Sequence, residues 1–181
     1  MSAPDHPGPS SPDANRGARY REVRERLAAL LAGEDDWIAG LATVASELHD
    51  TFDHYDWTGF YRVVTPGLLV VGPYQGTHGC LRIAFTRGVC CAAARTRVTQ
   101  LVERVSARPD HIACSASTQS EIVVPVIAPA GQLLAVLDVD SAQAAAFDDV
   151  DRAGLEEICR DLGAHFPLGE NHRVRPVGPT D

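Results

Sequence analysis

The sequence contains no lysine, so every residue in its count of lysines and arginines is an arginine. The 16 arginines are outnumbered by 24 acidic residues, which gives a formal net charge of −8 at pH 7. A protein that binds nucleic acid through its phosphates needs an excess of basic side chains, because these displace the backbone counterions. The charge balance therefore predicts that nucleic acid is not a partner.

Long apolar runs are also missing. No run approaches the roughly 20 residues that span a bilayer as a helix. The N-terminus has neither the basic region nor the apolar region of a signal peptide. We therefore expect no membrane association and a cytoplasmic location. In that reducing compartment the five cysteines are expected to be catalytic, redox-active or metal-binding rather than structural disulfides.

Length and proline distribution predict one domain with two tails. A chain of 181 residues is long enough for one domain and short for two. Seven of the 12 prolines lie near the two ends of the chain, where apolar residues are too few to offset the entropy lost on ordering. We predict a disordered tail over 1–17, a catalytic domain over 18–166 and a flexible tail over 167–181.

Hydrophobic periodicity predicts helices at both ends of the domain and strands between them. The predicted helices are 20–32, 36–49, 89–95 and one that follows the N-cap Asp148. The predicted strands are 56–64, 68–72, 98–102, 122–128 and 133–139, the first two joined by a hairpin turn. This order is typical of an α/β protein of the α+β type, with a central antiparallel sheet and flanking helices.

Three acidic residues adjoin apolar strands. Asp138 and Asp140 continue a predicted strand and share one of its faces, because residues two apart on a strand point the same way. Glu121 directly precedes another predicted strand. These positions are explained either by strand ends that emerge into solvent or, if the two strands are neighbours, by three converging carboxylates. Such a cluster can bind a cationic amine, and repulsion between the charges can keep a proton on one of them.

The cysteines allow several interpretations. Cys114 is followed by a polar stretch, which favours an accessible thiol near Glu121 over an inert core cysteine. A zinc site would have to combine Cys114 and His111 with Cys80, Cys90 and Cys91. No Cys-x-x-Cys pair exists, and adjacent cysteines do not easily reach one tetrahedral ion. We therefore expect neither a metal nor another cofactor.

Aromatic side chains mark the first predicted strand. Trp57, Gly59 and Tyr61 share one face of it, and Phe60 points to the other face. The two rings are either core aromatics or the walls of a binding site, in which Gly59 leaves a gap for a small soft group such as a methyl sulfide.

Taken in chain order, these motifs resemble those of the free methionine-(R)-sulfoxide reductases, enzymes built on a GAF domain. The resemblance covers about residues 37–165. It is carried by Trp57-Thr58-Gly59-Phe60-Tyr61, Gly72-Pro73-Tyr74-Gln75-Gly76, Cys80 with Ile83, Gly88-Val89-Cys90, His111-Ile112-Ala113-Cys114, Ser120-Glu121-Ile122-Val123-Val124-Pro125 and Leu137-Asp138-Val139-Asp140-Ser141.

The resemblance implies a GAF-like fold and reduction of free methionine-(R)-sulfoxide. It makes Cys114 the attacking thiol and Cys80 the resolving thiol. Cys90 matches a third family cysteine, and its role is ambiguous because that cysteine also pairs with the Cys80 position. The implied binding residues are Glu121, Asp138 and Asp140 as the acidic cluster, with Trp57 and Tyr61 as the aromatic walls. Family members are typically homodimers recycled by thioredoxin.

Elementary chemistry suggests how the acidic residues act. Carboxylates raise the pKa of a nearby thiol, so they do not activate Cys114 by charge. They fit better as donors to the sulfoxide oxygen, with Glu121 and Asp140 in that role and Asp138 holding the substrate ammonium. Two alternatives remain: a GAF module that binds a small ligand without chemistry, and a cysteine redox sensor.

Four positions depart from the family pattern. Cys91 and Asp110 replace glycines, Ser115 replaces an acidic residue, and Ala135 replaces the glycine of a Leu-Gly-Val-Leu-Asp run. Cys91 is the least explained, since it is either a spectator or a spare resolving thiol. We expect Cys91→Gly to keep turnover and to gain a little stability if this position has a left-handed backbone.

Overall fold

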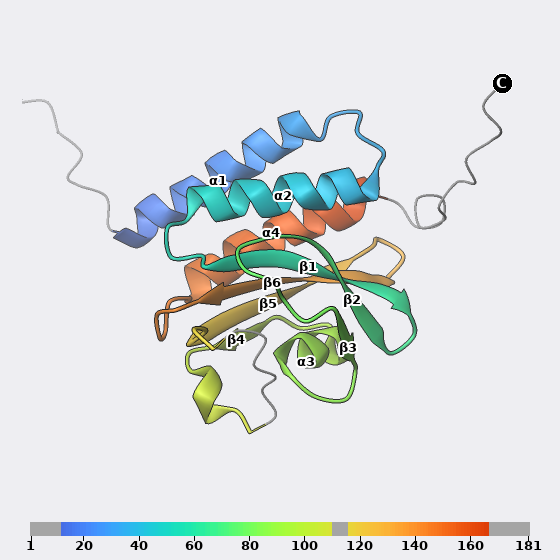
Figure 1. The fold of residues 1–181 in the computed structure, drawn as a ribbon. Coiled ribbons are helices and arrows are strands. Elements are labelled where there is room, and N and C mark those ends of the chain that lie inside the picture. The colour runs from blue at the N-terminus through green and yellow to red at the C-terminus, as the bar shows by residue number, and fades with distance from the viewer. Residues whose placement is uncertain (1–11, 110–115, 167–181) are drawn as a thin grey trace, which may run out of the picture.

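The protein is described by a computed structural model that covers residues 12–109 and 116–166. Figure 1 shows a single layer of sheet with helices above and below it. The helices are α1 (Pro12–Leu30), α2 (Trp37–Thr51), α3 (Val89–Thr96) and α4 (Asp149–His165), with a short 3-10 turn at Val105–Ala107. The strands are β1 (Trp57–Thr65), β2 (Leu68–Gln75), β3 (Arg82–Ala84), β4 (Gln100–Val102), β5 (Ser120–Ile127) and β6 (Leu133–Ser141).

The six strands form one sheet in the order β3-β2-β1-β6-β5-β4, and all neighbours are antiparallel. Helices α1, α2 and α4 cover one face, and α3 lies against the other (Figure 1). The predicted α+β class, with a central antiparallel sheet and flanking helices, is confirmed.

The strands divide the apolar residues between two cores. Phe60 packs with the three long helices, whereas Trp57 and Tyr61 belong to the second core under α3. This split follows from the two-residue period of a strand. The sequence therefore separates a structural face, covered by helices, from a face that α3 and the loops around it enclose.

Local signals explain most helix boundaries. Asp36 caps α2 by accepting hydrogen bonds from the backbone of Ile38 and Ala39. Asp148 caps α4 as predicted, and the Asp151 side chain accepts a hydrogen bond from the Asp148 backbone N–H, which completes a capping box.

The first helix differs from its prediction. It begins at Pro12 rather than at residue 20, so residues 12–17 are helical and not part of a tail. Arg16 in this first turn pairs with Asp148 and lies 3.5 Å from Asp151. These tertiary contacts hold a segment that its own composition does not predict to be ordered. The remaining predicted tail residues, 1–11 and 167–181, lie outside the described residues.

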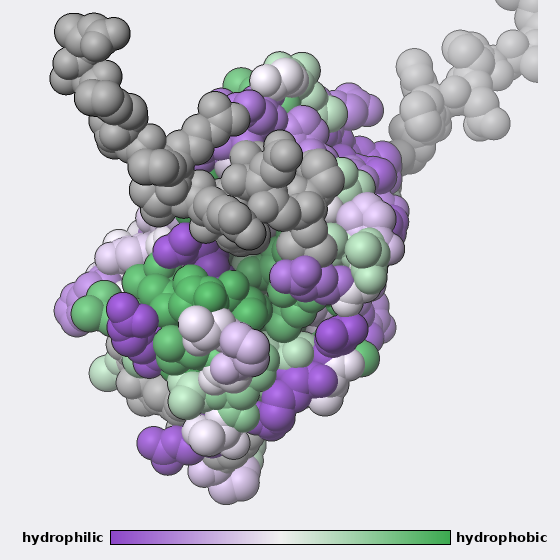
Figure 2. All heavy atoms as spheres, turned by 90° about the vertical axis from the view of Figure 1, so that its right-hand side faces the viewer, coloured by the Kyte–Doolittle hydropathy of each residue, from purple (hydrophilic) through white to green (hydrophobic). Residues whose placement is uncertain are grey.

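The sheet edges also differ in detail. The short strand β3 was not predicted, and the predicted strand 98–102 begins only at Gln100. Figure 2, which faces the side where the β1–β2 hairpin ends, shows apolar side chains gathered at the level of the sheet. In the β1–β2 hairpin, Val64 of β1 is 45% exposed. Within the described ranges, no helix combines the length and apolarity needed to cross a membrane.

Candidate active site

The sheet register brings the three predicted carboxylates together. Strands β5 and β6 are neighbours, and Glu121 lies directly opposite Asp140. Asp138 is two residues from Asp140 on the same face of β6, opposite Gly59 on β1. The condition set by the sequence, that the two strands adjoin, is therefore met, and the carboxylates converge on the face that α3 covers.

Burial makes this cluster electrostatically unusual. Glu121 is only 5% exposed and Asp138 only 7%. Burial raises the pKa of Asp138 well above its ordinary value, and the charges of Asp140 and Glu121 add to the effect. Burial likewise raises the pKa of Asp140, followed by the charges of Glu121 and Asp56. A carboxyl in this position can keep its proton at a pH where an exposed one has lost it.

Cys90 joins the cluster from α3. Its Sγ donates a hydrogen bond to Asp138 Oδ2 at 3.3 Å. Burial raises the pKa of the Cys90 thiol well above its usual value, and the carboxylates of Asp138 and Glu121 raise it further. Cys90 is therefore a neutral thiol near pH 7, suited to donating a hydrogen bond rather than to attacking an electrophile.

Cys91 points elsewhere. It is buried in α3 and donates from Sγ to the carbonyl of Ala84 at 3.0 Å. The non-glycine residues with positive φ in the described ranges are Arg97 and Ala145. Cys91 therefore does not have the left-handed backbone that the sequence analysis considered for this position. The adjacent cysteines face different surroundings, as expected for consecutive residues of a helix.

An aromatic stack forms one side of the cluster. The rings of Trp57 and Tyr61 lie nearly parallel with centroids 5.8 Å apart, and Tyr74 also stacks on Trp57, with centroids 5.3 Å apart. A Cβ on Gly59 would lie 2.3 Å from Tyr74 Cβ and 2.7 Å from the Trp57 ring. The predicted gap at Gly59 is thus filled by aromatic side chains. Tyr74 is a wall residue that the sequence did not single out, although it lies opposite Gly59 across the hairpin.

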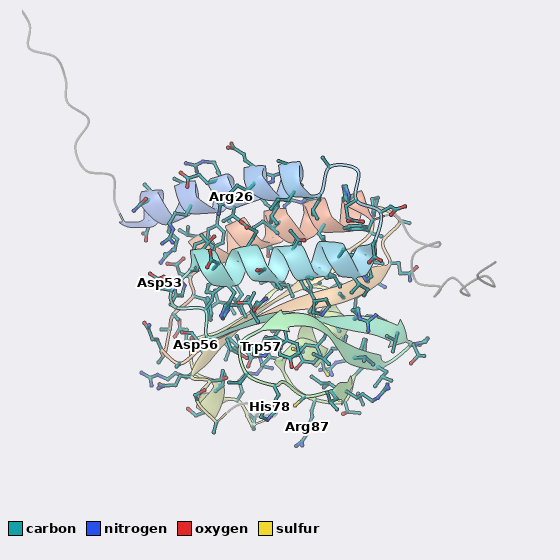
Figure 3. The ribbon with its side chains drawn as sticks, turned by 45° about the horizontal axis from the view of Figure 1, so that its top comes forward. Arg26, Asp53, Asp56, Trp57, His78 and Arg87 are labelled. Carbon is teal, nitrogen blue, oxygen red and sulfur yellow. The ribbon has the colours of Figure 1, made fainter. Side chains whose placement is uncertain are left out.

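The loop after β2 is hydrogen-bonded to two of these aromatic side chains, Trp57 and Tyr61. Trp57 Nε1 donates to the Thr77 carbonyl at 2.8 Å. The backbone N–H of Cys80 donates to the Tyr61 hydroxyl, which is buried and whose pKa is raised first by that burial and then by Asp138. Gly76 has a φ of +103°, and a Cβ there would lie 2.7 Å from the Asp56 carbonyl oxygen. Figure 3 shows Trp57 and His78 on the side of the sheet away from the three long helices.

The predicted cysteines differ in what the structure describes. Cys80 is disulfide-bonded, whereas Cys90, Cys91 and Cys159 are free and buried. Cys159 packs in the core under the helices, as a structural cysteine does. Cys114, the predicted nucleophile, lies outside the described residues. Its relation to the carboxylates is therefore still a prediction.

Fold and site together define a class of protein, a small α+β domain with a cluster of carboxylates, a thiol and aromatic rings on one face of its sheet. The sequence profile described as "GAF domain" matches residues 39–166.

Three relatives refine this assignment. The free methionine-R-sulfoxide reductase of Escherichia coli is 36% identical over 148 residues, which are 82% of this chain and 88% of that protein. The X-ray structure of free methionine-R-sulfoxide reductase from Neisseria meningitidis in complex with its substrate is 41% identical, with a TM-score of 0.80, and the match covers 89% of this chain and 93% of that one. A putative GAF sensor protein from Burkholderia vietnamiensis is 45% identical, also with a TM-score of 0.80, over 83% and 95% of the two chains. This chain belongs to the free methionine-R-sulfoxide reductase family of GAF-domain proteins.

Proposed function

We propose that this protein reduces free L-methionine-(R)-sulfoxide to L-methionine, with Cys114 as nucleophile and Cys80 as resolving thiol. The observation that carries the proposal is the cluster of buried Glu121 and Asp138 with half-buried Asp140, beside the aromatic stack of Trp57 and Tyr61. The names of the relatives from E. coli and N. meningitidis support the substrate.

The cluster suits both polar ends of the reaction. A sulfoxide oxygen leaves carbon-bound sulfur more readily when it is protonated or hydrogen-bonded, and Asp140 has the raised pKa that lets it carry the proton. Glu121, directly opposite, is the second donor in this scheme. Asp138, whose Oδ1 has no hydrogen-bond partner among the described residues, holds the substrate ammonium. The need for a free ammonium favours the free amino acid over methionine sulfoxide within a protein.

The redox step is a two-electron exchange between sulfur atoms. Cys114 attacks the sulfoxide sulfur, the oxygen passes to the cysteine, and methionine leaves while Cys114 is oxidised to a sulfenic acid. Cys80 then attacks the sulfenic sulfur, a water molecule leaves with the oxygen, and a disulfide joins the two cysteines. The disulfide state of Cys80 and the free state of Cys90 support this division of roles. Cys90 positions Asp138 through its hydrogen bond.

A ligand-binding or redox-sensing GAF domain without turnover is the alternative, and the description of the Burkholderia relative as a putative sensor favours it. The deciding experiment incubates the protein with the separate R and S epimers of free methionine sulfoxide and dithiothreitol, and assays methionine. We expect consumption of the R epimer, with the S epimer and peptide-bound sulfoxide nearly untouched. Binding of the R epimer without methionine formation would favour the sensor.

Single-turnover assays test the cysteine roles. Cys114→Ser is expected to form no methionine, because the attacking thiol is gone. Cys80→Ser is expected to form one equivalent and then to stop at a sulfenic acid, detectable by a dimedone adduct. Cys159→Ser is the matched control and should behave as the wild type. A methionine yield from Cys114→Ser equal to that of the wild type would mean that another thiol attacks.

We also propose thioredoxin as the reductant, a homodimer as the assembly and the cytoplasm as the location. The family resemblance supports the first two. Turnover with thioredoxin, thioredoxin reductase and NADPH in place of dithiothreitol tests the first, and sedimentation equilibrium tests the second.

A further inference from the structure

The acidic cluster has a second chemical capacity that the reductase scheme does not use. The sulfur of Cys90 and carboxylate oxygens of Glu121 and Asp138 all lie within 4.8 Å of one another. The three residues come from α3, β5 and β6, and all three are buried. Three different elements of the fold thus hold one thiol and two carboxylates around a common point.

The hydrogen bonding of Asp138 is a second, independent observation that points to a ligand between these three residues. It is only 7% exposed, and its Oδ2 accepts the hydrogen bond from Cys90. Its other oxygen, Oδ1, is buried without a hydrogen-bond partner in the part of the chain that the structure describes. A buried carboxylate oxygen left in this state is costly, and a bound cation removes the cost.

We propose that the reduced, substrate-free protein binds one thiophilic divalent cation, with Zn²⁺ as the probe, between Cys90, Glu121 and Asp138. Zinc accepts cysteine sulfur at about 2.3 Å and carboxylate oxygen at about 2.0–2.2 Å, which places neighbouring ligand atoms about 3.3–3.8 Å apart. The distance from Cys90 Sγ to Asp138 Oδ2, 3.3 Å, already meets this spacing, and the ligand atoms of all three residues lie within 4.8 Å of one another. Cys90 loses its proton to solvent on binding, and its thiolate forms the metal bond. Three protein ligands leave a fourth position for water.

The cation is expected to compete with the substrate, and this expectation rests on the proposed function. The cation and the substrate ammonium are both positive and both require Asp138, so one excludes the other. The sequence disfavoured zinc because its cysteines and His111 form no knuckle. The fold instead combines a single cysteine with carboxylates that are far away in sequence, a set that spacing does not reveal.

The experiment titrates full-length protein, reduced with a phosphine, with Zn²⁺ against a chromophoric zinc indicator. One equivalent is expected to bind. Cys90→Ser and Asp138→Asn are each expected to weaken binding by more than about 100-fold, because even changes outside the ligand shell cost about 10–100-fold. The matched control is Cys159→Ser, which removes a buried free thiol elsewhere and should leave the affinity unchanged.

The double variant Cys80→Ser/Cys114→Ser keeps the result interpretable if either ligand variant fails to fold. It retains Cys90 and is expected to bind Zn²⁺ like the wild type, with a thiolate-to-metal absorption band when Cd²⁺ replaces Zn²⁺. Loss of binding in this double variant, or undiminished binding in a folded Cys90→Ser protein, would overturn the proposal. Neither readout depends on catalysis. Failure of the reductase proposal would appear separately, as absence of methionine in the epimer assay.

Discussion

Asp138 and Asp140 are two residues apart on one strand face, yet their surroundings assign them different work. Asp138 accepts the hydrogen bond of Cys90, whereas Asp140 lies opposite Glu121 and feels the charge of Asp56. The alternation of side chains along β6 predicts that both carboxylates lie on the same face of the sheet. The different neighbours of the two carboxylates cannot be predicted in this way, because Cys90 comes from α3 and Glu121 from β5.

Asp140→Asn tests the proton-donor role at this scale. The amide keeps the shape of the side chain but has no acidic proton, so we expect kcat to fall by about 10²–10⁴. Activity of the wild type should also decline as the pH rises through the raised pKa of the donor, and this decline should be lost in the variant. Steady-state rates from pH 5 to 9 provide the measurement. Asp149→Asn, a change at a carboxylate whose side chain is 89% exposed, is the control.

Cys91 shows where reasoning from family pattern fails. Its sequence position suggested a glycine-like backbone, and the structure places it inside a helix with a buried side chain. The stability half of the Cys91→Gly expectation is therefore reversed. The predicted helix over 89–95 already included this position, so periodicity was a better guide to its backbone than the family pattern.

Cys91→Gly is now expected to destabilise the protein by about 1–3 kcal/mol. Glycine costs about 1 kcal/mol in a helix interior, and the lost side chain removes buried apolar area. Cys91→Ala should cost less, because it keeps Cβ. Urea unfolding measures both. Each variant should retain thioredoxin-linked turnover, and loss of turnover in Cys91→Ala would identify this residue as a resolving thiol.

At the scale of elements, the loop from Gly76 to Cys80 and strand β1 act as a unit. The strand supplies the aromatic rings, and the same rings hold the loop through Thr77 and Cys80. The proposed resolving cysteine is thus positioned by the residues that line the proposed substrate pocket.

Tyr61→Phe separates these two tasks. The ring stays, but the hydroxyl that accepts from the Cys80 backbone is removed. A hydrogen bond of about 1 kcal/mol corresponds to roughly a fivefold change, so disulfide formation after the first turnover should slow by about that factor. Methionine release in a single turnover should remain near the wild-type rate. Rapid quench followed by peptide mapping measures both steps.

Tyr74→Phe is the control for this variant, since Tyr74 also stacks on Trp57 and is 37% exposed. Its disulfide step should be unchanged. If Tyr61→Phe slowed both steps equally, the hydroxyl would serve the substrate rather than the loop.

Element prediction succeeded where local signals are strong. The hairpin around residues 65–67, helix α3 and the capped helix α4 match their predicted positions closely. The start of α1 and strand β3 were missed for a shared reason. Arg16 holds the first turn of α1 through residues of α4, and β3 has three residues that pair only with β2. Both depend on partners distant along the chain rather than on their own sequence.

At the scale of the whole molecule, the cluster couples stability to pH. Asp138 binds its proton more tightly in the folded than in the unfolded protein, because its folded pKa is raised by burial. The folded state therefore binds more protons, and the free energy of unfolding falls as the pH rises from the unfolded pKa of about 3.9 towards the raised folded value. Burial of a carboxyl that the proposed site uses thus reduces stability at neutral pH.

Asp138→Asn should remove this contribution. We expect the variant to be more stable than the wild type at pH 8, by an amount on the order of 1 kcal/mol, with the difference shrinking towards pH 4. Catalysis should be largely lost in the same protein. Urea unfolding at both pH values measures the effect, and Asp149→Asn should leave the pH dependence unchanged. A variant less stable than the wild type at pH 8 would contradict this view of the cluster.

Helix α1 matters for anyone who expresses this domain. The family profile begins at residue 39, so a clone trimmed to that profile would discard α1 and the turn after it, which together place Tyr20, Val23, Leu27 and Leu31 in the core. Asp151, fully buried beneath α1, would lose its hydrogen bond from Tyr20 at 2.8 Å. The trimmed protein would expose Asp151 and the apolar surface that α1 covers to solvent, and it would be expected to aggregate and precipitate. The useful cloning boundary lies at or before Pro12.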